Sequence, residues 1–98
     1  MARLNLGSVE LGDFDRDWFI VMSRLGGKST RANASSVIGF YVRRRIDQYR
    51  EMLTYTARKY GITEDEVFHR LLNDQELGTP VQGFSEPPPE LAEDTGEE

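Results

Sequence analysis

The clearest pattern in the chain is an apolar stripe that recurs at helical spacing over residues 31–60. When successive residues are placed at steps of about 100°, one side of a single helix collects most of the apolar side chains. The helix would be about 45 Å long at a rise of about 1.5 Å per residue, and Gly39 is where it could break, since glycine weakens a helix interior. The residues of this stripe are Ala34, Ile38, Tyr41, Val42, Ile46, Tyr49, Met52, Leu53, Thr56 and Tyr60.

A shorter apolar pattern precedes the stripe and predicts a helix over residues 14–25. Gly26 is suited to the left-handed conformation that ends many helices, and Ser29 or Thr30 to the N-cap of the next helix. The run from Trp18 to Met22 is short enough to be a strand instead, and that alternative stays open. The apolar positions are Phe14, Trp18, Val21, Met22 and Leu25, and the acidic residues suited to the first turn are Asp13, Asp15 and Asp17.

Another helix is predicted after residue 60. Gly61 follows the stripe and is suited to end the long helix. Thr63 and Glu66 have the spacing of a capping box, in which the two side chains satisfy backbone N–H groups at the start of a helix. We therefore expect a helix over residues 64–73. Its buried face would carry Val67, Phe68, Leu71 and Leu72.

The two ends of the chain differ from the middle. Leu4, Leu6, Val9 and Leu11 predict an extended arm or a short strand over residues 1–12. Residues 79–98 are acidic, contain proline and offer little to bury, so they are predicted to form a disordered tail. The expected fold is mainly α, with one small helical domain over residues 13–78. The alternative is an α+β fold in which an N-terminal β-hairpin packs on the helices.

Charge is distributed unevenly, and this changes the picture of what the chain could bind. Residues 1–60 carry 11 Lys and Arg against 6 Asp and Glu, whereas residues 61–98 carry 1 against 11, which gives the overall net charge of −5. A basic body could meet nucleic acid, an acidic protein surface or the chain's own tail. Its charges could also form an ordinary solvated face with pairs such as Arg43 and Asp47.

The segment Gly27-Lys28-Ser29 looks like the end of a phosphate-binding loop, but the rest of that motif is missing. The motif needs a glycine where this chain has Met22. The chain has no cysteine and a single histidine, His69, so no metal-ligand set is evident. Its serines have no candidate base. We expect no catalysis, no cofactor, no metal and no small-molecule substrate.

Residues 57–67 resemble the core of a helix-turn-helix, with Ala57, Gly61, Ile62 and Val67 at the matching positions. The same stretch resembles the end of a ribbon-helix-helix domain, which implies that residues 36–42 form a DNA-reading strand. The helix-turn-helix resemblance implies that the start of the second helix meets base edges. Here that start is acidic, which opposes docking on a polyanion.

Apolar residues off the stripe point to a partner. A unit this small buries only about 60% of its unfolded surface, so covering a second side of the long helix is difficult. We therefore predict a regulatory or adaptor module that binds another protein or itself through Val37, Phe40, Arg43, Arg44, Arg45, Arg50 and Tyr55. The alternative is a nucleic-acid-binding regulator that uses Lys28, Arg31, Arg43, Arg44, Arg58 and Lys59. No run is long enough to span a membrane and the first residues do not resemble a signal peptide, so a cytoplasmic location is expected.

Overall fold

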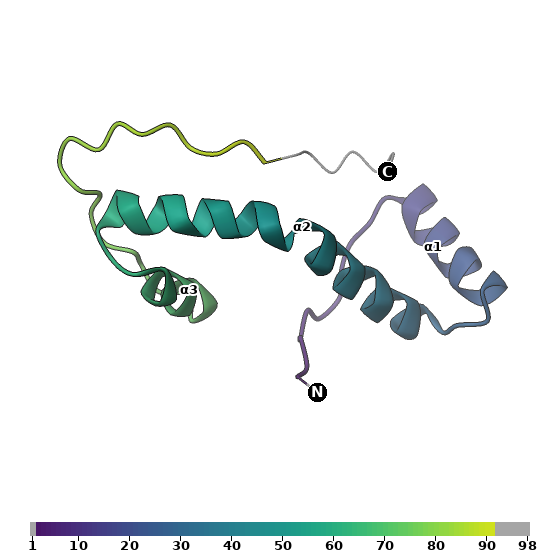
Figure 1. Ribbon diagram of the computed structural model, residues 1–98. Helices are drawn as coiled ribbons and strands as arrows, with labels where there is room; N and C mark the ends of the chain where they lie inside the picture. Colours follow the sequence, from purple (N-terminus) through teal and green to yellow (C-terminus); the bar gives the residue numbers. More distant parts are fainter. Residues whose placement is uncertain (1, 92–98) are drawn as a thin grey trace. The chain divides into compact units, whose positions relative to one another are not determined.

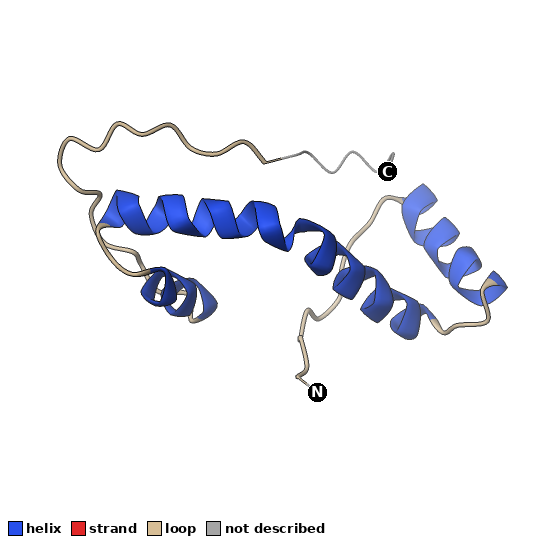
Figure 2. Ribbon diagram, in the orientation of Figure 1, coloured by secondary structure: helices blue, strands red, loops and turns tan. Residues whose placement is uncertain are grey.

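The computed structural model describes residues 2–91, and its ordered elements are helices (Figures 1 and 2). They are α1 (Asp13–Leu25), α2 (Thr30–Tyr60) and α3 (Glu64–Leu72). The three predicted helices are confirmed to within one residue at each end, and α2 continues through Gly39 without a break. Within residues 2–91 there is no strand, so residues 2–12 are an extended arm and Trp18 to Met22 belong to α1. The alternative with an N-terminal β-hairpin is therefore wrong.

The chain divides into two compact units, Met1–Tyr41 and Val42–Glu98, and α2 passes from the first to the second. Unit 1 holds the arm, α1 and the start of α2. Unit 2 holds the rest of α2, α3 and the segment that follows α3. Each unit is described by itself below.

In unit 1, α1 begins without a side-chain cap but carries charges that suit both of its ends. Gly12 stands at its N-cap, acidic residues occupy its first turn, and Arg24 lies in its last turn, which complements the helix dipole at both ends. The reversal after α1 differs from the prediction. Gly26 keeps a negative φ of −81° because its N–H still bonds to the carbonyl of Met22. The left-handed residue is Gly27, with φ 75°.

A polar contact links the two helices of unit 1. The Ser23 side chain is buried, donates from Oγ to the carbonyl of Phe19 over 2.6 Å and accepts from Nδ2 of Asn33 over 2.9 Å. Its carbonyl accepts from the N–H of Lys28 over 2.9 Å. The predicted cap of α2 is Ser29, whose Oγ accepts from the N–H of Ala32 over 3.1 Å. Hydrogen bonds, more than apolar packing, thus define the turn between α1 and α2.

In unit 2, local backbone geometry sets the turn between α2 and α3. Gly61 is left-handed at φ 65°, its N–H bonds to the carbonyl of Arg58, and the N–H of Ile62 bonds to the carbonyl of Ala57. This is the Schellman arrangement, which satisfies carbonyls at a helix end. Thr63 then caps α3 as predicted, because its Oγ1 accepts from the N–H of Glu66 over 3.0 Å.

The core is smaller than the apolar pattern predicted. Among the described residues, the buried apolar side chains are Tyr55, Ala57 and Val67, all in unit 2. The predicted buried face of α3 is therefore corrected, since Phe68, Leu71 and Leu72 are exposed and Val67 alone is covered. The α2 stripe is corrected in the same way, because too little chain is available to cover it. Its exposed members are Ile38, Tyr41, Val42, Ile46 and Tyr49.

The segment after α3 returns along α2 (Figure 1). Asp74 is left-handed at φ 55°, and Arg70 Nη1 donates to the carbonyl of Leu77 over 3.3 Å. The N–H of Val81 then donates to the carbonyl of Lys59 over 2.7 Å. Residues 79–91 contain no helix or strand, yet they contact α2, which is one of the alternatives that the opposite charges of the tail and the basic body left open. The last part of the predicted disordered tail, residues 92–98, lies outside the described residues.

Candidate functional site

The apolar and aromatic residues predicted to bind a partner do not share one environment. Val37 and Phe40 are exposed on the part of α2 that belongs to unit 1. Tyr55 is only 8% exposed, which corrects its assignment as a surface contact. Its ring meets the ring of Phe84 edge-on, with centroids 5.5 Å apart and an interplanar angle of 67°. The chain's own tail supplies the aromatic cover that was expected from a partner.

The arginines predicted to bind a partner also differ in their exposure. Arg45 is 6% exposed, so its side chain lies inside the fold, as its position within the apolar stripe indicates. An arginine can do this because its stem is apolar. Arg43, Arg44 and Arg50 are exposed. The surface cations of unit 2 therefore include these three arginines but not Arg45.

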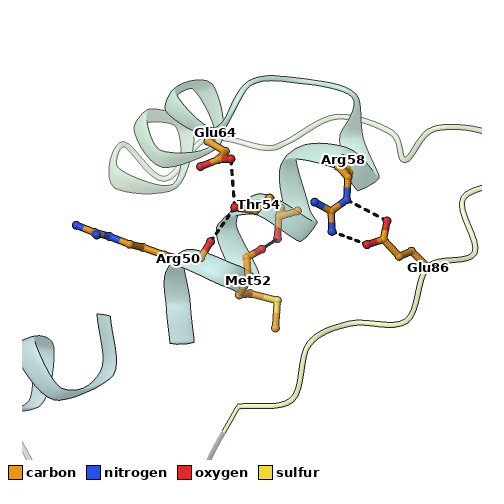
Figure 3. A network of polar contacts seen from close by, with 7 residues as sticks. Arg50, Met52, Thr54, Arg58, Glu64 and Glu86 are labelled. Atoms are coloured by element: carbon orange, nitrogen blue, oxygen red, sulfur yellow. Dashed lines mark hydrogen bonds and ion pairs between the residues drawn. The ribbon is translucent and has the colours of Figure 1, made fainter. Parts of the chain in front are cut away.

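The most developed polar site in unit 2 is a forked ion pair between α2 and the tail (Figure 3). Arg58 Nε donates to Glu86 Oε2 over 3.0 Å, and Nη2 donates to Oε1. The hydrogen bond from Arg58 lowers the pKa of the Glu86 carboxyl below its ordinary value. The same bond raises the pKa of Arg58, and the nearby Glu64 carboxylate adds to this rise. Both groups remain partly exposed, so solvent screens their attraction.

Thr54 connects this region to α3 (Figure 3). Its Oγ1 lies 3.1 Å from the carbonyl oxygen of Arg50 and 3.1 Å from Glu64 Oε2, so one hydroxyl proton serves two acceptors. A shallow depression beside Thr54 is lined by Glu51, Arg58 and Pro89 as well. Pro89 thus lies beside α2, in addition to the contacts that Val81, Phe84 and Glu86 make with this helix.

These groups form a surface on α2, which we call the tail-binding surface and define by Glu51, Thr54, Tyr55, Arg58 and Lys59. It presents an aromatic ring, a guanidinium group and the carbonyl of Lys59 at the end of α2, which accepts from the N–H of Val81. Such a set can hold a peptide segment that carries an aromatic ring and a carboxylate. Sequence reasoning named Tyr55 and Arg58 for other roles and missed Phe84 and Glu86. The signal that could have found them is the acidic tail beside a basic helix.

We expect the contact between the tail and α2 to weaken at acidic pH. Because Glu86 has a lowered pKa in the folded chain, its pairing contributes fully above the ordinary glutamate pKa of about 4.3 and is lost as the pH falls through the lowered value. The ring signals of Phe84, followed by nuclear magnetic resonance, should titrate in this acid range. In Glu86→Gln that titration should disappear, and an unchanged curve in this variant would contradict the assignment.

The residues proposed for nucleic acid are spread over both units. Lys28 and Arg31 are exposed in unit 1, while Arg58 is engaged by Glu86 and Lys59 Nζ lies 5.7 Å from the centroid of the Tyr60 ring in unit 2. The ribbon-helix-helix resemblance is corrected, because residues 36–42 are part of α2 and not a strand. A short turn over residues 61–63 joins α2 to α3, and acidic residues fill the first turn of α3.

The single histidine, His69, contacts residues of its own helix. His69 Nδ1 lies 2.8 Å from the carbonyl oxygen of Asp65, and its ring meets Phe68 edge-on. Within residues 2–91, His, Asp and Glu side chains form no group of three that could hold a metal ion. No helix in this range is long and apolar enough to cross a membrane. Comparison with known proteins finds no matching family model, no similar curated protein and no similar solved structure.

Proposed function

We propose that the protein is a small non-enzymatic regulatory or adaptor module that acts by binding another protein, which can be a second copy of itself. The observation that carries this proposal is the exposed apolar face of α1. Its members share one side of the helix and are 52–80% exposed: Phe14, Trp18, Met22 and Leu25. We call these four residues the α1 face. An amphipathic helix with an uncovered apolar side is typical of an interaction surface.

The size of the α1 face limits the binding free energy that it can contribute to a complex. Fully burying a large apolar side chain is worth about 1.5–3 kcal/mol, so covering four half-exposed ones contributes on the order of 5 kcal/mol. Association itself costs about 4–15 kcal/mol in lost freedom. The α1 face alone is therefore too small for a tight complex. Val37 and Phe40, which are exposed in the same unit, supply the additional apolar area.

The exposed arginines of α2 favour an acidic partner. Arg43, Arg44 and Arg50 are exposed on α2, and residues 1–60 carry an excess of positive charge. Such cations accelerate encounter with acidic surfaces and exclude basic ones, with smaller effects on the final affinity. Binding of an acidic partner should therefore slow as the salt concentration rises.

The test is site-specific photo-crosslinking in the full chain, in cells that make the protein. A photoreactive phenylalanine analogue at Trp18 should crosslink to one discrete protein, a second copy included. The matched control places the same analogue at Arg16, which lies on the polar side of α1 and pairs with Asp13 and Asp17. Equal labelling from both positions, or no adduct from Trp18, would contradict the proposal.

Nucleic acid is the competing class of partner, and charge decides where it would bind. If the chain retards labelled DNA or RNA in a gel, Arg43→Glu combined with Arg44→Glu should abolish the shift, because each change replaces attraction to phosphate with repulsion. Glu64→Gln combined with Asp65→Asn is the comparison. A shift that survives the arginine changes would place the contact elsewhere, and a shift that they abolish would favour nucleic acid over a protein partner.

A further inference from the structure

The tail does not simply lie near α2; it makes a different kind of contact at each of several positions. The N–H of Val81 donates to the carbonyl of Lys59 over 2.7 Å, at the end of α2. Three residues later Phe84 meets the ring of Tyr55, and two residues after that Glu86 accepts the Arg58 fork (Figure 3). Pro89 then lines the depression beside Thr54. Successive positions of the tail thus meet one short stretch of α2, residues 51–59.

Each contact has a chemical reason to be selective. The last carbonyls of a helix have no partner within the helix, so the end of α2 offers an acceptor to any extended segment. An edge-on aromatic pair requires a ring at the position of Phe84. The guanidinium group binds a carboxylate through two parallel hydrogen bonds, which favours glutamate or aspartate over other residues. Gly61 also leaves room for Val81, because a Cβ on Gly61 would lie 3.0 Å from Val81 Cγ2.

The contacts between the tail and α2 are also weak enough for another segment to replace the tail. The side chains of Arg58 and Glu86 are 52% and 41% exposed, and exposed ion pairs are weak. The tail reaches this surface without a helix or strand, and its one local feature is a turn in which the N–H of Phe84 donates to the carbonyl of Val81 over 3.1 Å. A segment attached to its own binding surface can occupy it at modest intrinsic affinity, because tethering gives an effective concentration on the order of millimolar.

We infer that the tail-binding surface is a recognition site for an acidic peptide segment of another protein, one with an aromatic residue two positions before a carboxylate. Residues 81–89 occupy this site as an intramolecular ligand, and the partner's segment must displace them. The site lies in unit 2 and does not use the α1 face, so it adds a second, regulated contact to the proposed function. Charge complementarity and the chemistry of the present occupant define the partner.

The experiment measures binding of a fluorescent synthetic peptide of residues 79–91 to the full-length protein. Phe84→Ala combined with Glu86→Gln frees the site without shortening the chain, and we expect this open variant to bind the peptide saturably. The wild type should bind on the order of tenfold more weakly, because its own tail competes. Adding Arg58→Gln to the open variant should abolish binding. Arg50→Gln, another exposed arginine of α2, is the matched control and should leave binding unchanged.

Several outcomes would overturn the inference. The site is absent if the open variant shows no saturable binding at millimolar peptide, or if Arg58→Gln and Arg50→Gln weaken binding equally. Wild type and open variant binding with equal affinity would exclude the intramolecular competition. Circular dichroism confirms that each variant is helical, and loss of Phe84 ring shifts in full-length Glu86→Gln tests the same contact without a peptide. Crosslinking from Trp18 is unaffected by these variants, so the two proposals can fail separately.

Discussion

Val67→Asp should unfold α3 and the part of unit 2 that packs against it. Val67 is 0% exposed and is the most deeply buried of the few apolar side chains in the core. A buried carboxylate without a partner costs several kcal/mol, which is comparable to the whole stability of about 5 kcal/mol at the lower end for small domains. Val67→Ala, which only removes methyl groups, should cost about 1–2.5 kcal/mol.

The neighbouring residue provides the control. Phe68 is larger than Val67 and lies next to it on α3, but its side chain is exposed, so Phe68→Asp should change the free energy of unfolding by less than about 0.5 kcal/mol. Thermal melts followed by circular dichroism compare the two variants directly. Similar melting curves for Val67→Asp and Phe68→Asp would show that Val67 is not part of the core of unit 2.

Helix boundaries could be predicted from the sequence because the signals that set them are local. Thr63 caps α3 through a hydrogen bond to a residue three positions away, and Gly61 ends α2 through its own left-handed backbone. Ser29 caps the start of α2 through a similar hydrogen bond to the N–H of Ala32. The one local error, Gly26 in place of Gly27, has a similar origin. Two adjacent glycines can both adopt the required conformation, and composition does not distinguish them.

Burial could not be predicted in the same way. Periodicity shows which side of a helix is apolar, but whether another element covers that side depends on how much chain is available. The α1 face and Phe68 have the pattern of core residues and remain exposed. Tyr55, by contrast, lies off the main stripe and is buried, because a ring 29 positions later in the chain covers it.

The candidate site shows the same limit. Arg58 was identified as one cation among many, since nothing nearby in the sequence distinguishes it from Arg50. Its role depends on Glu86, which is 28 residues away. The charge imbalance between residues 1–60 and 61–98 indicated that the tail could meet the basic body, without indicating the residue pair. Only the three-dimensional structure identifies which carboxylate of the acidic segment pairs with which arginine of α2.

Gly61→Ala should weaken both the α2–α3 turn and the attachment of the tail. A non-glycine residue at φ 65° costs about 1–2 kcal/mol, because its Cβ approaches the backbone. The new Cβ would also lie 3.0 Å from Val81 Cγ2. Val81 is exposed and belongs to the tail, so the tail can withdraw to relieve this contact. We therefore expect a loss of about 1–2 kcal/mol in unfolding free energy, together with loss of the Phe84 ring shifts.

Two further variants separate the backbone effect from the contact with Val81. Gly27→Ala introduces a side chain at φ 75° with nothing within 4 Å, so it reports backbone strain alone and should cost a similar free energy without affecting the tail. Val81→Ala in the Gly61→Ala background removes the clashing methyl groups while keeping the N–H that donates to Lys59. The Phe84 ring shifts should then return. If they remain absent in this double variant, the tail is not held in place by the fit between Val81 and Gly61.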